Sequence, residues 1–263
     1  MRYFLHLAYD GTRFHGWQVQ PNTLTVQQEL DRCLSQVLRQ PVYTLGSGRT
    51  DSGVHASHQV AHFDADLPPS LDEATILYRL NRALPPDIAV RRLHPVPDKA
   101  HARFDAEART YEYFVRTIPD PFGVNQSLYL DRAPDVAAMN TAATYLVGSR
   151  DFTSFSKVKG GENHYICVCY EAAWHPIPGG LVFRIRANRF VRGMVRLVVG
   201  TLLSVGRGKL TPEEFGHILH TQSRIAASGA AVAKGLFLSR VEYPSELVAA
   251  EEPTGMPYFV LNP

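Results

Sequence analysis

The chain begins with an alternation of polar and apolar positions over residues 2–9, which predicts a strand with one buried face. The following segment has a helical period, because its apolar residues recur at spacings of three, four and seven: Val26, Leu30, Cys33, Leu34, Val37 and Leu38. Thr25 and Gln28 have the spacing of a capping box at its start. A strand followed by an amphipathic helix is therefore expected at the amino-terminal end.

Turn residues and the periodicity of apolar residues predict four further elements up to residue 93. In order, the pattern predicts strands over 42–46 and 57–65, a helix from about Ser70 to Leu84, and a strand over 88–93. Ser70 and Glu73 form a second predicted capping box, and Pro85-Pro86 ends the helix. The first part of the chain therefore has the order strand, helix, strand, strand, helix, strand.

The second part of the chain repeats this order. Its predicted elements are a strand over 109–117, a helix at about 135–147, strands near 164–174 and 181–187, a helix at about 190–205 and a strand over 236–243. Thr211 and Pro212 start one extra helix, because threonine caps a helix and proline suits its first position.

The repeated order predicts an α+β protein built from two ferredoxin-like or RRM-like halves. Mainly antiparallel sheets would flank a central active-site cleft, with the helices on the outer faces. We expect the halves to be residues 1–104 and 105–245, followed by a tail over 246–263.

Composition narrows the class of protein further. The 263 residues are 45% hydrophobic and 20% charged, which is ordinary for a globular protein, and no run of 18 apolar residues is present. The start of the chain has no signal-peptide pattern. The chain has an odd number of cysteines, namely Cys33, Cys167 and Cys169. Cys167 and Cys169 lie two residues apart on one predicted strand, where a disulfide between them is unfavourable. We therefore expect no membrane span and a cytoplasmic location.

Charge is nearly balanced overall, at +2, but it is unevenly distributed. Residues 181–210 contain no acidic residue and seven basic ones: Arg184, Arg186, Arg189, Arg192, Arg196, Arg207 and Lys209. Such a segment suits a polyanion such as RNA, although a solvated basic helix face would have the same composition.

The segment from Gly48 to Ala56, GRTDSGVHA, carries the strongest chemical signal. Its glycines permit a sharp turn and a close approach of a ligand, and Arg49 lies two residues from Asp51. A carboxylate beside a cation stays ionised and is able to act as a nucleophile or a base. The alternative is that Asp51 only caps a turn.

This segment, followed by Gln59-Val60 and His62-Phe63-Asp64, resembles the signature of the tRNA pseudouridine synthase A family. The resemblance continues through Tyr9-Asp10-Gly11, Phe14, Gly16-Trp17-Gln18, Gln20, Thr25-Val26-Gln27, Leu80-Asn81, Leu84-Pro85, Asp87-Ile88, His101-Ala102-Arg103-Phe104, Arg109-Thr110-Tyr111-Glu112-Tyr113, Asp151-Phe152-Thr153-Ser154-Phe155, Phe190-Val191, Met194-Val195-Arg196, Val199-Gly200 and Gly235-Leu236. It therefore covers about 240 residues. Departures from the family pattern are Ser52 in place of alanine, the absence of prolines over 227–234, and Phe237 in place of tyrosine.

The resemblance implies an isomerase that converts uridine to pseudouridine at positions 38, 39 and 40 of the tRNA anticodon stem-loop. It implies that this reaction uses no metal or organic cofactor, and that a homodimer holds the tRNA. By the same resemblance the catalytic residues are Asp51, Tyr111 and Arg196. The residues expected at the RNA are Arg49, Gly53, Val54, His55, Arg189 and Arg192.

The basic residues of this set have more specific expected roles. Arg196 is the expected ion-pair partner of Asp51, and helical spacing is expected to place Arg189 and Arg192 on roughly its face, at phosphates. The target nucleotide must leave the RNA stem to react, and Arg49 is expected either to contact the RNA backbone near it or to help occupy the space that it vacates.

Other classes of function compete with this interpretation. A metal site is one alternative, at His55, His58 and His62. No carboxylate or cysteine, however, has a convincing ligand spacing to these histidines. A noncatalytic RNA-binding protein of the same fold would share the basic segment. A glycoside hydrolase that depends on Asp51 would require a second carboxylate, which the motif does not offer.

Overall fold

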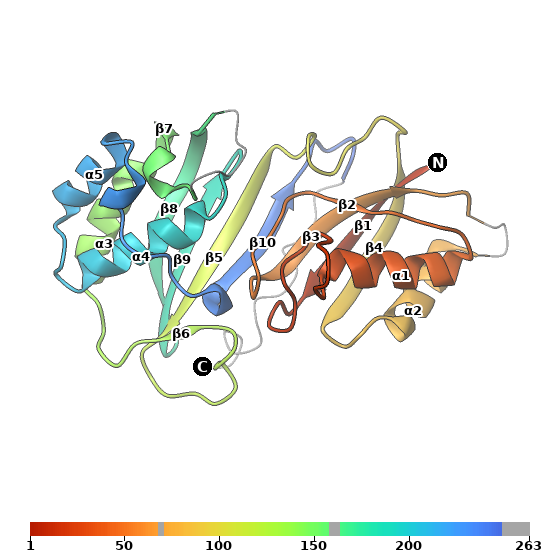
Figure 1. Ribbon diagram of the computed structural model, residues 1–263, viewed down its shortest axis with the longest axis horizontal. Helices are drawn as coiled ribbons and strands as arrows, with labels where there is room; N and C mark the ends of the chain where they lie inside the picture. Colours follow the sequence, from red (N-terminus) through yellow and green to blue (C-terminus); the bar gives the residue numbers. More distant parts are fainter. Residues whose placement is uncertain (68–70, 158–163, 249–263) are drawn as a thin grey trace. The chain divides into compact units, whose positions relative to one another are not determined.

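The computed structural model describes residues 1–67, 71–157 and 164–248, which fall into two compact units (Figure 1). Unit 1 contains Met1–Glu107 together with residues 237–248, and unit 2 contains Ala108–Leu236. The chain therefore leaves unit 1 after Glu107 and returns to it at Phe237.

The strands of unit 1 form a sheet in the order β4-β1-β3-β10. Its elements are β1 (Arg2–Tyr9), α1 (Val26–Leu38), β2 (Leu45–Gly46), β3 (His55–Asp64), α2 (Glu73–Ala83), β4 (Ile88–Val96) and β10 (Leu236–Glu242). Strand β1 is antiparallel to both β3 and β4, and the short β2 pairs with β3. Strand β10 is parallel to its neighbour β3, which it meets at Phe237 and Leu238.

Helices α1 and α2 lie side by side along the sheet of unit 1 (Figure 1). Leu30 and Leu34 of α1 and Ile76 of α2 are fully buried, as the apolar stripe of an amphipathic helix requires. The Thr25 hydroxyl accepts a hydrogen bond from the backbone N–H of Gln28, so the predicted amino-terminal cap of α1 is confirmed.

The strands of unit 2 have the order β5-β9-β8-β7, with antiparallel pairing between each strand and the next. Its helices and strands are β5 (Ala108–Arg116), β6 (Leu128–Tyr129), α3 (Val136–Ala143), β7 (Gly148–Asp151), β8 (Ile166–Ile177), β9 (Gly180–Ala187), α4 (Met194–Gly206) and α5 (Pro212–His220). Together the two units confirm the predicted α+β class with mainly antiparallel strands.

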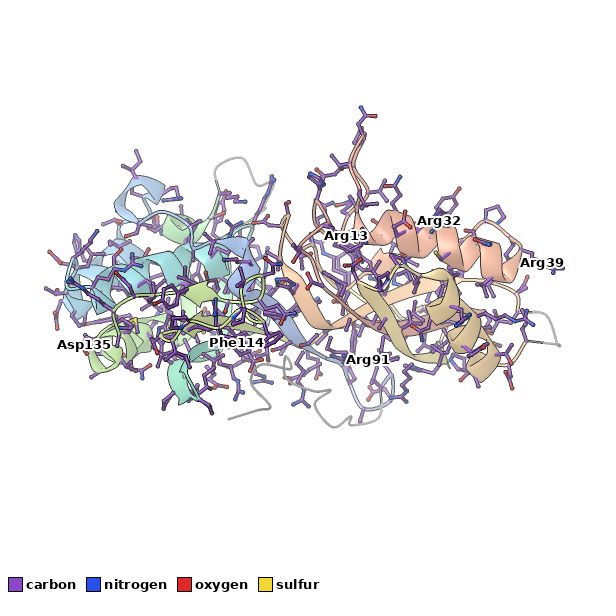
Figure 2. The ribbon with its side chains drawn as sticks, turned by 90° about the horizontal axis from the view of Figure 1, so that it is seen from below. Arg13, Arg32, Arg39, Arg91, Phe114 and Asp135 are labelled. Atoms are coloured by element: carbon purple, nitrogen blue, oxygen red, sulfur yellow. The ribbon has the colours of Figure 1, made fainter. Side chains whose placement is uncertain are left out.

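Helix α4 of unit 2 packs against both α3 and α5, which also contact each other (Figure 1). Ten of its thirteen residues are buried, including Val198, Val199 and Leu202. In Figure 2, Phe114 marks the buried interior at β5 and Asp135 marks the start of α3, where its carboxylate accepts a hydrogen bond from the Ala138 N–H. No helix in the described part of the chain is long and apolar enough to cross a membrane.

Two predicted helix starts are wrong, and each error has a local cause. Helix α2 begins at Glu73, because Asp72 is the capping residue and accepts a hydrogen bond from the Thr75 N–H; Ser70 lies outside the described residues. Helix α4 begins at Met194, because Gly193 has the left-handed φ of +76°. The start of α5 is confirmed as predicted, with a complete capping box between Thr211 and its third helical residue.

Candidate active site

Asp51 lies in the loop between β2 and β3, with its side chain partly exposed. The Val54 N–H donates a hydrogen bond to the Asp51 carbonyl at 3.1 Å, which closes a tight turn around the acid. Gly53 inside this turn has φ +74°, a conformation that glycine adopts without steric cost. The glycine after the acid is therefore required by the backbone of the turn.

Residues 10–17 form a second loop that holds the Asp51 loop from one side. The Gly53 N–H donates to the Phe14 carbonyl at 3.1 Å, and the Trp17 N–H donates to the Thr50 carbonyl at 3.4 Å. The Thr50 hydroxyl also lies 2.9 Å from the phenol oxygen of Tyr9 in β1. Hydrogen bonds thus fix the backbone on both sides of Asp51.

The two loops approach so closely that glycine is required at the contact. A Cβ atom added to Gly11 would lie 2.0 Å from the Val54 carbonyl oxygen, and one added to Gly16 would lie 2.4 Å from the Thr50 carbonyl oxygen. Gly16 also has φ +92°. These glycines explain why a glycine- and aromatic-rich segment precedes α1.

Buried polar side chains of β3 hold the other side of the Asp51 loop. Gln59 is fully buried; its Nε2 donates to the Gly48 carbonyl at 3.1 Å and its Oε1 accepts from the Ser47 hydroxyl. A buried amide with its groups paired in this way constrains the entry into the loop.

His55 is also fully buried, with its Nδ1 within hydrogen-bond distance of the Gly11 N–H at 3.0 Å and of Asp10 Oδ1 at 3.2 Å. Its ring stacks on Phe237 of β10, with centroids 4.5 Å apart. Although burial raises the pKa of Asp10, the neighbouring His55 ring and hydrogen bonds from the Thr12 N–H and hydroxyl keep it well below its usual value. The Asp10 carboxylate is therefore ionised and links the two loops.

Tyr111 and Arg196 lie in unit 2. Tyr111 is a partly buried residue of β5 and pairs with Ile185 of β9. Its ring makes an edge-to-face contact with the ring of Phe190, with the two centroids 4.9 Å apart. Arg196 lies in the first turn of α4, where its Nε donates to the Ala231 carbonyl at 2.7 Å. Unit 2 thus carries a partly buried aromatic ring on β5 and an anchored guanidinium in the first turn of α4.

The helical face predicted for Arg189 and Arg192 is wrong, because both residues precede Gly193 and α4. Arg189 Nη1 lies 2.8 Å from Nε2 of His164. Arg192 is exposed, and its carbonyl accepts a hydrogen bond from the Lys157 N–H at 2.9 Å. The two arginines therefore lie in the loop before α4, where their side chains do not follow a helical spacing.

The candidate residues are divided between the two units. Unit 1 holds Arg49, Asp51, Gly53, Val54 and His55, and unit 2 holds Tyr111, Arg189, Arg192 and Arg196. Arg49 is exposed, whereas Val54 and His55 are 2% and 0% exposed and hold the loop from inside. Sequence reasoning assigned no role to the 10–17 loop, although its two glycines beside buried aromatic residues were a usable signal.

The histidines of β3 have structural partners rather than a shared ligand position. His58 and His62 share one face of the strand, and a β-bulge opposite Leu7 and Tyr9 of β1 interrupts the side-chain alternation between His55 and His58. His58 Nε2 lies 3.0 Å from Nδ1 of His6, and His62 Nδ1 accepts from the Ala102 N–H at 3.2 Å. Within the described residues, no group of three or more histidine, cysteine or acidic side chains is arranged to hold a metal ion.

Comparison with known proteins gives consistent matches over both units. Residues 6–105 and 142–244 match the family described as tRNA pseudouridine synthase. The chain is 49% identical to the tRNA pseudouridine synthase A of Bacteroides thetaiotaomicron, over 95% of this chain and 93% of that protein. It is 47% identical to the protein of the same name from Porphyromonas gingivalis, over 94% and 98%, and 39% identical to that from Bacillus licheniformis, over 92% and 99%.

Proposed function

The chain belongs to the tRNA pseudouridine synthase family, and on that premise we propose that Asp51, Tyr111 and Arg196 convert uridine to pseudouridine at positions 38, 39 and 40 of the tRNA anticodon stem-loop. Isomerisation of uridine in tRNA is the reaction of the family. The observation that carries the assignment of Asp51 is its loop, which hydrogen bonds from residues 10–17 and from Gln59 fix on both sides.

The reaction breaks the N1–C1′ bond and forms a C5–C1′ bond between the same base and ribose. Positive charge develops at C1′ as the first bond breaks, so an ionised carboxylate beside C1′ either adds to that carbon or removes a neighbouring proton. The detached uracil then turns, C5 joins C1′, C5 gives up its proton to a base, and N1 ends with a proton. We assign the carboxylate to Asp51 and leave both routes to the products open.

Tyr111 is assigned to the target base. Its ring is partly exposed on β5 and Phe190 supports it from the side, so one aromatic face is held in a defined orientation. Such a face stacks on uracil through its whole rotation, and the phenol is suited to proton transfer at C5.

Arg196 is assigned to the Asp51 carboxylate, whose ionised form a guanidinium favours. Joint action on one nucleotide requires Asp51 to meet Tyr111 and Arg196 at the central cleft that the two predicted ferredoxin-like halves, residues 1–104 and 105–245, would flank. A stacked and paired uridine hides its C1′ and C5, so the proposal includes extrusion of the base, which costs less beside a loop.

The remaining cations are assigned to the RNA backbone. Arg49 and Arg192 are exposed, and Arg189 lies in the same loop as Arg192. Gly53 permits close approach of RNA to the loop, while the buried Val54 and His55 act through the position of the loop. A homodimer and a cytoplasmic location, both expected from the sequence, complete the proposal.

The test follows tritium released to water from stem-loop transcripts that each carry one 5-tritiated uridine, at position 38, 39 or 40, in the presence of EDTA. We expect release by the wild type and by Asp66→Asn, a control at a fully exposed carboxylate. Asp51→Asn should bind each transcript yet lose on the order of 10⁴-fold in rate. Binding without release by the wild type would instead identify a noncatalytic RNA-binding protein.

A further inference from the structure

Residues 227–235, which we call the α4 brace, lie along the helix that carries Arg196. The Arg196 Nε donates to the Ala231 carbonyl at 2.7 Å, and the Ala231 N–H donates to the Arg196 carbonyl at 2.8 Å. One turn further along, the Ser228 N–H donates to the Thr201 hydroxyl at 3.2 Å. The direction of the guanidinium therefore depends on where the backbone at Ala231 lies.

The sequence of the α4 brace does not hold this backbone in place by itself. It contains two glycines and four alanines and no proline, so its dihedral angles have little intrinsic restriction. Close contact with the helix compensates on one side: a Cβ atom on Gly200 would lie 2.0 Å from the Gly229 carbonyl oxygen. A second anchor is required at the other end of the brace, after Ala231.

Tyr113 of β5 supplies that anchor. Its side chain is fully buried, and its hydroxyl donates to the Val232 carbonyl at 3.0 Å, one residue beyond the carbonyl that accepts from Arg196. The ring also packs against Gly235, where a Cβ atom would lie 2.8 Å from Tyr113 Cζ. Hydroxyl and ring together fix the end of the brace.

The phenol of Tyr113 is suited to be a permanent donor. Burial raises its pKa well above the usual value, and the positive charge of Arg196 opposes that rise only in part. The hydroxyl therefore stays protonated at neutral pH and remains a donor to the Val232 carbonyl.

We infer that Tyr113 is a positioning residue for Arg196: it holds Val232, and through the adjoining Ala231 carbonyl it sets the direction of the guanidinium. This inference rests on the proposed role of Arg196 in catalysis. Because Nε is engaged by Ala231, the bond orients the two terminal nitrogens, which are the donors suited to a carboxylate.

The test is Tyr113→Phe, which keeps the buried ring and removes only the hydroxyl. We expect kcat to fall about tenfold through misplacement of the guanidinium. The KM for tRNA should change less than about twofold, because the Tyr113 side chain is fully buried and the substitution leaves the protein surface unaltered. Since a displaced cation favours the ionised carboxylate less, the acid limb of the kcat profile should move to higher pH.

Tyr129→Phe is the matched control, at a tyrosine of β6 that is 43% exposed, and it should leave kcat and the acid limb at their wild-type values. Gly200→Ala reaches the same brace from the helix side and should reproduce the lower kcat with an unchanged KM. An unchanged kcat in Tyr113→Phe, or a lower kcat with an unmoved acid limb, overturns the inference.

Arg196→Lys separates this inference from the proposed function. If Arg196→Lys has the kcat and acid limb of the wild type, the catalytic role of Arg196 is wrong. If Arg196→Lys is slow and Tyr113→Phe is not, only the inference is wrong. Where both hold, the double variant should be no slower than Arg196→Lys alone, because the hydroxyl then has no catalytic guanidinium to position.

Discussion

The Asp51 loop is positioned by hydrogen bonds of backbone groups more than by side chains. The carbonyl of Thr50 and the N–H of Gly53, which flank Asp51, are both bound to residues 10–17, and Gly16 passes the Thr50 carbonyl at a distance that excludes a side chain. If Asp51 is the catalytic carboxylate, as proposed, it loses little conformational freedom when substrate binds.

Gly16→Ala tests this arrangement. Alanine at φ +92° is strained and its Cβ would collide with the Thr50 carbonyl, so the free energy of unfolding should fall by about 1–3 kcal/mol and kcat should fall with it. Urea unfolding and tritium release measure the two effects. Gly48→Ala, where a Cβ would meet no atom within 4 Å, should keep its unfolding free energy within about 0.5 kcal/mol of the wild type.

At the scale of the elements, the sheet of unit 1 buries a set of histidine rings. His6 of β1 lies 3.0 Å from His58 of β3, and its ring is 5.1 Å from that of His94 of β4. Burial, with the neighbouring His58, His94 and Arg92, lowers the pKa of His6 to about 2. Burial also lowers the pKa of His62 to about 4.

These shifts predict acid destabilisation of unit 1. In the unfolded chain His6 and His62 bind protons below about pH 6.5. In the folded chain His62 does so only near pH 4 and His6 only near pH 2. The free energy of unfolding therefore falls as pH falls below about 6.5. On going from pH 7 to pH 5, each of the two histidines should lower the free energy of unfolding by about 2 kcal/mol.

The measurement is urea unfolding at the two pH values. His6→Gln should lose its part of the pH dependence, whereas His15→Gln, at an exposed histidine, should keep all of it. Equal pH dependence in the wild type and His6→Gln would contradict the assignment of the buried cluster.

At the scale of the whole molecule, the net charge is only +2, but residues 181–210 form a basic segment suited to binding a polyanion. Binding of tRNA should weaken as salt rises, because each phosphate contact releases counterions. Arg192→Gln should reduce the slope of log K against log salt by about 1. Arg79→Gln, at an exposed arginine of α2, should keep the wild-type slope, and an equal loss in both variants would remove Arg192 from the proposed RNA contacts.

Most helices and the longer strands could be predicted from the sequence alone, because hydrophobic period, caps and turn residues act between near neighbours in the chain. The short strands β6 and β7 were not predicted. Thr25 and Thr211 cap the helices that follow them, and the resemblance of the Asp51 loop identified the family. The start of α4 was mistaken because the apolar period continued through Gly193, whose left-handed conformation ends it.

Only the tertiary structure decided which distant backbone groups hold the candidate residues. Gly16 meets Thr50 across more than thirty residues, and Tyr113 reaches Val232 across 119. Neither contact leaves a periodic signal, because each is made to the backbone carbonyl of a distant residue, whose own side chain the contact does not constrain. The sequence thus determined the elements, the family and the candidate chemistry, while packing between distant segments determined how Asp51 and Arg196 are held.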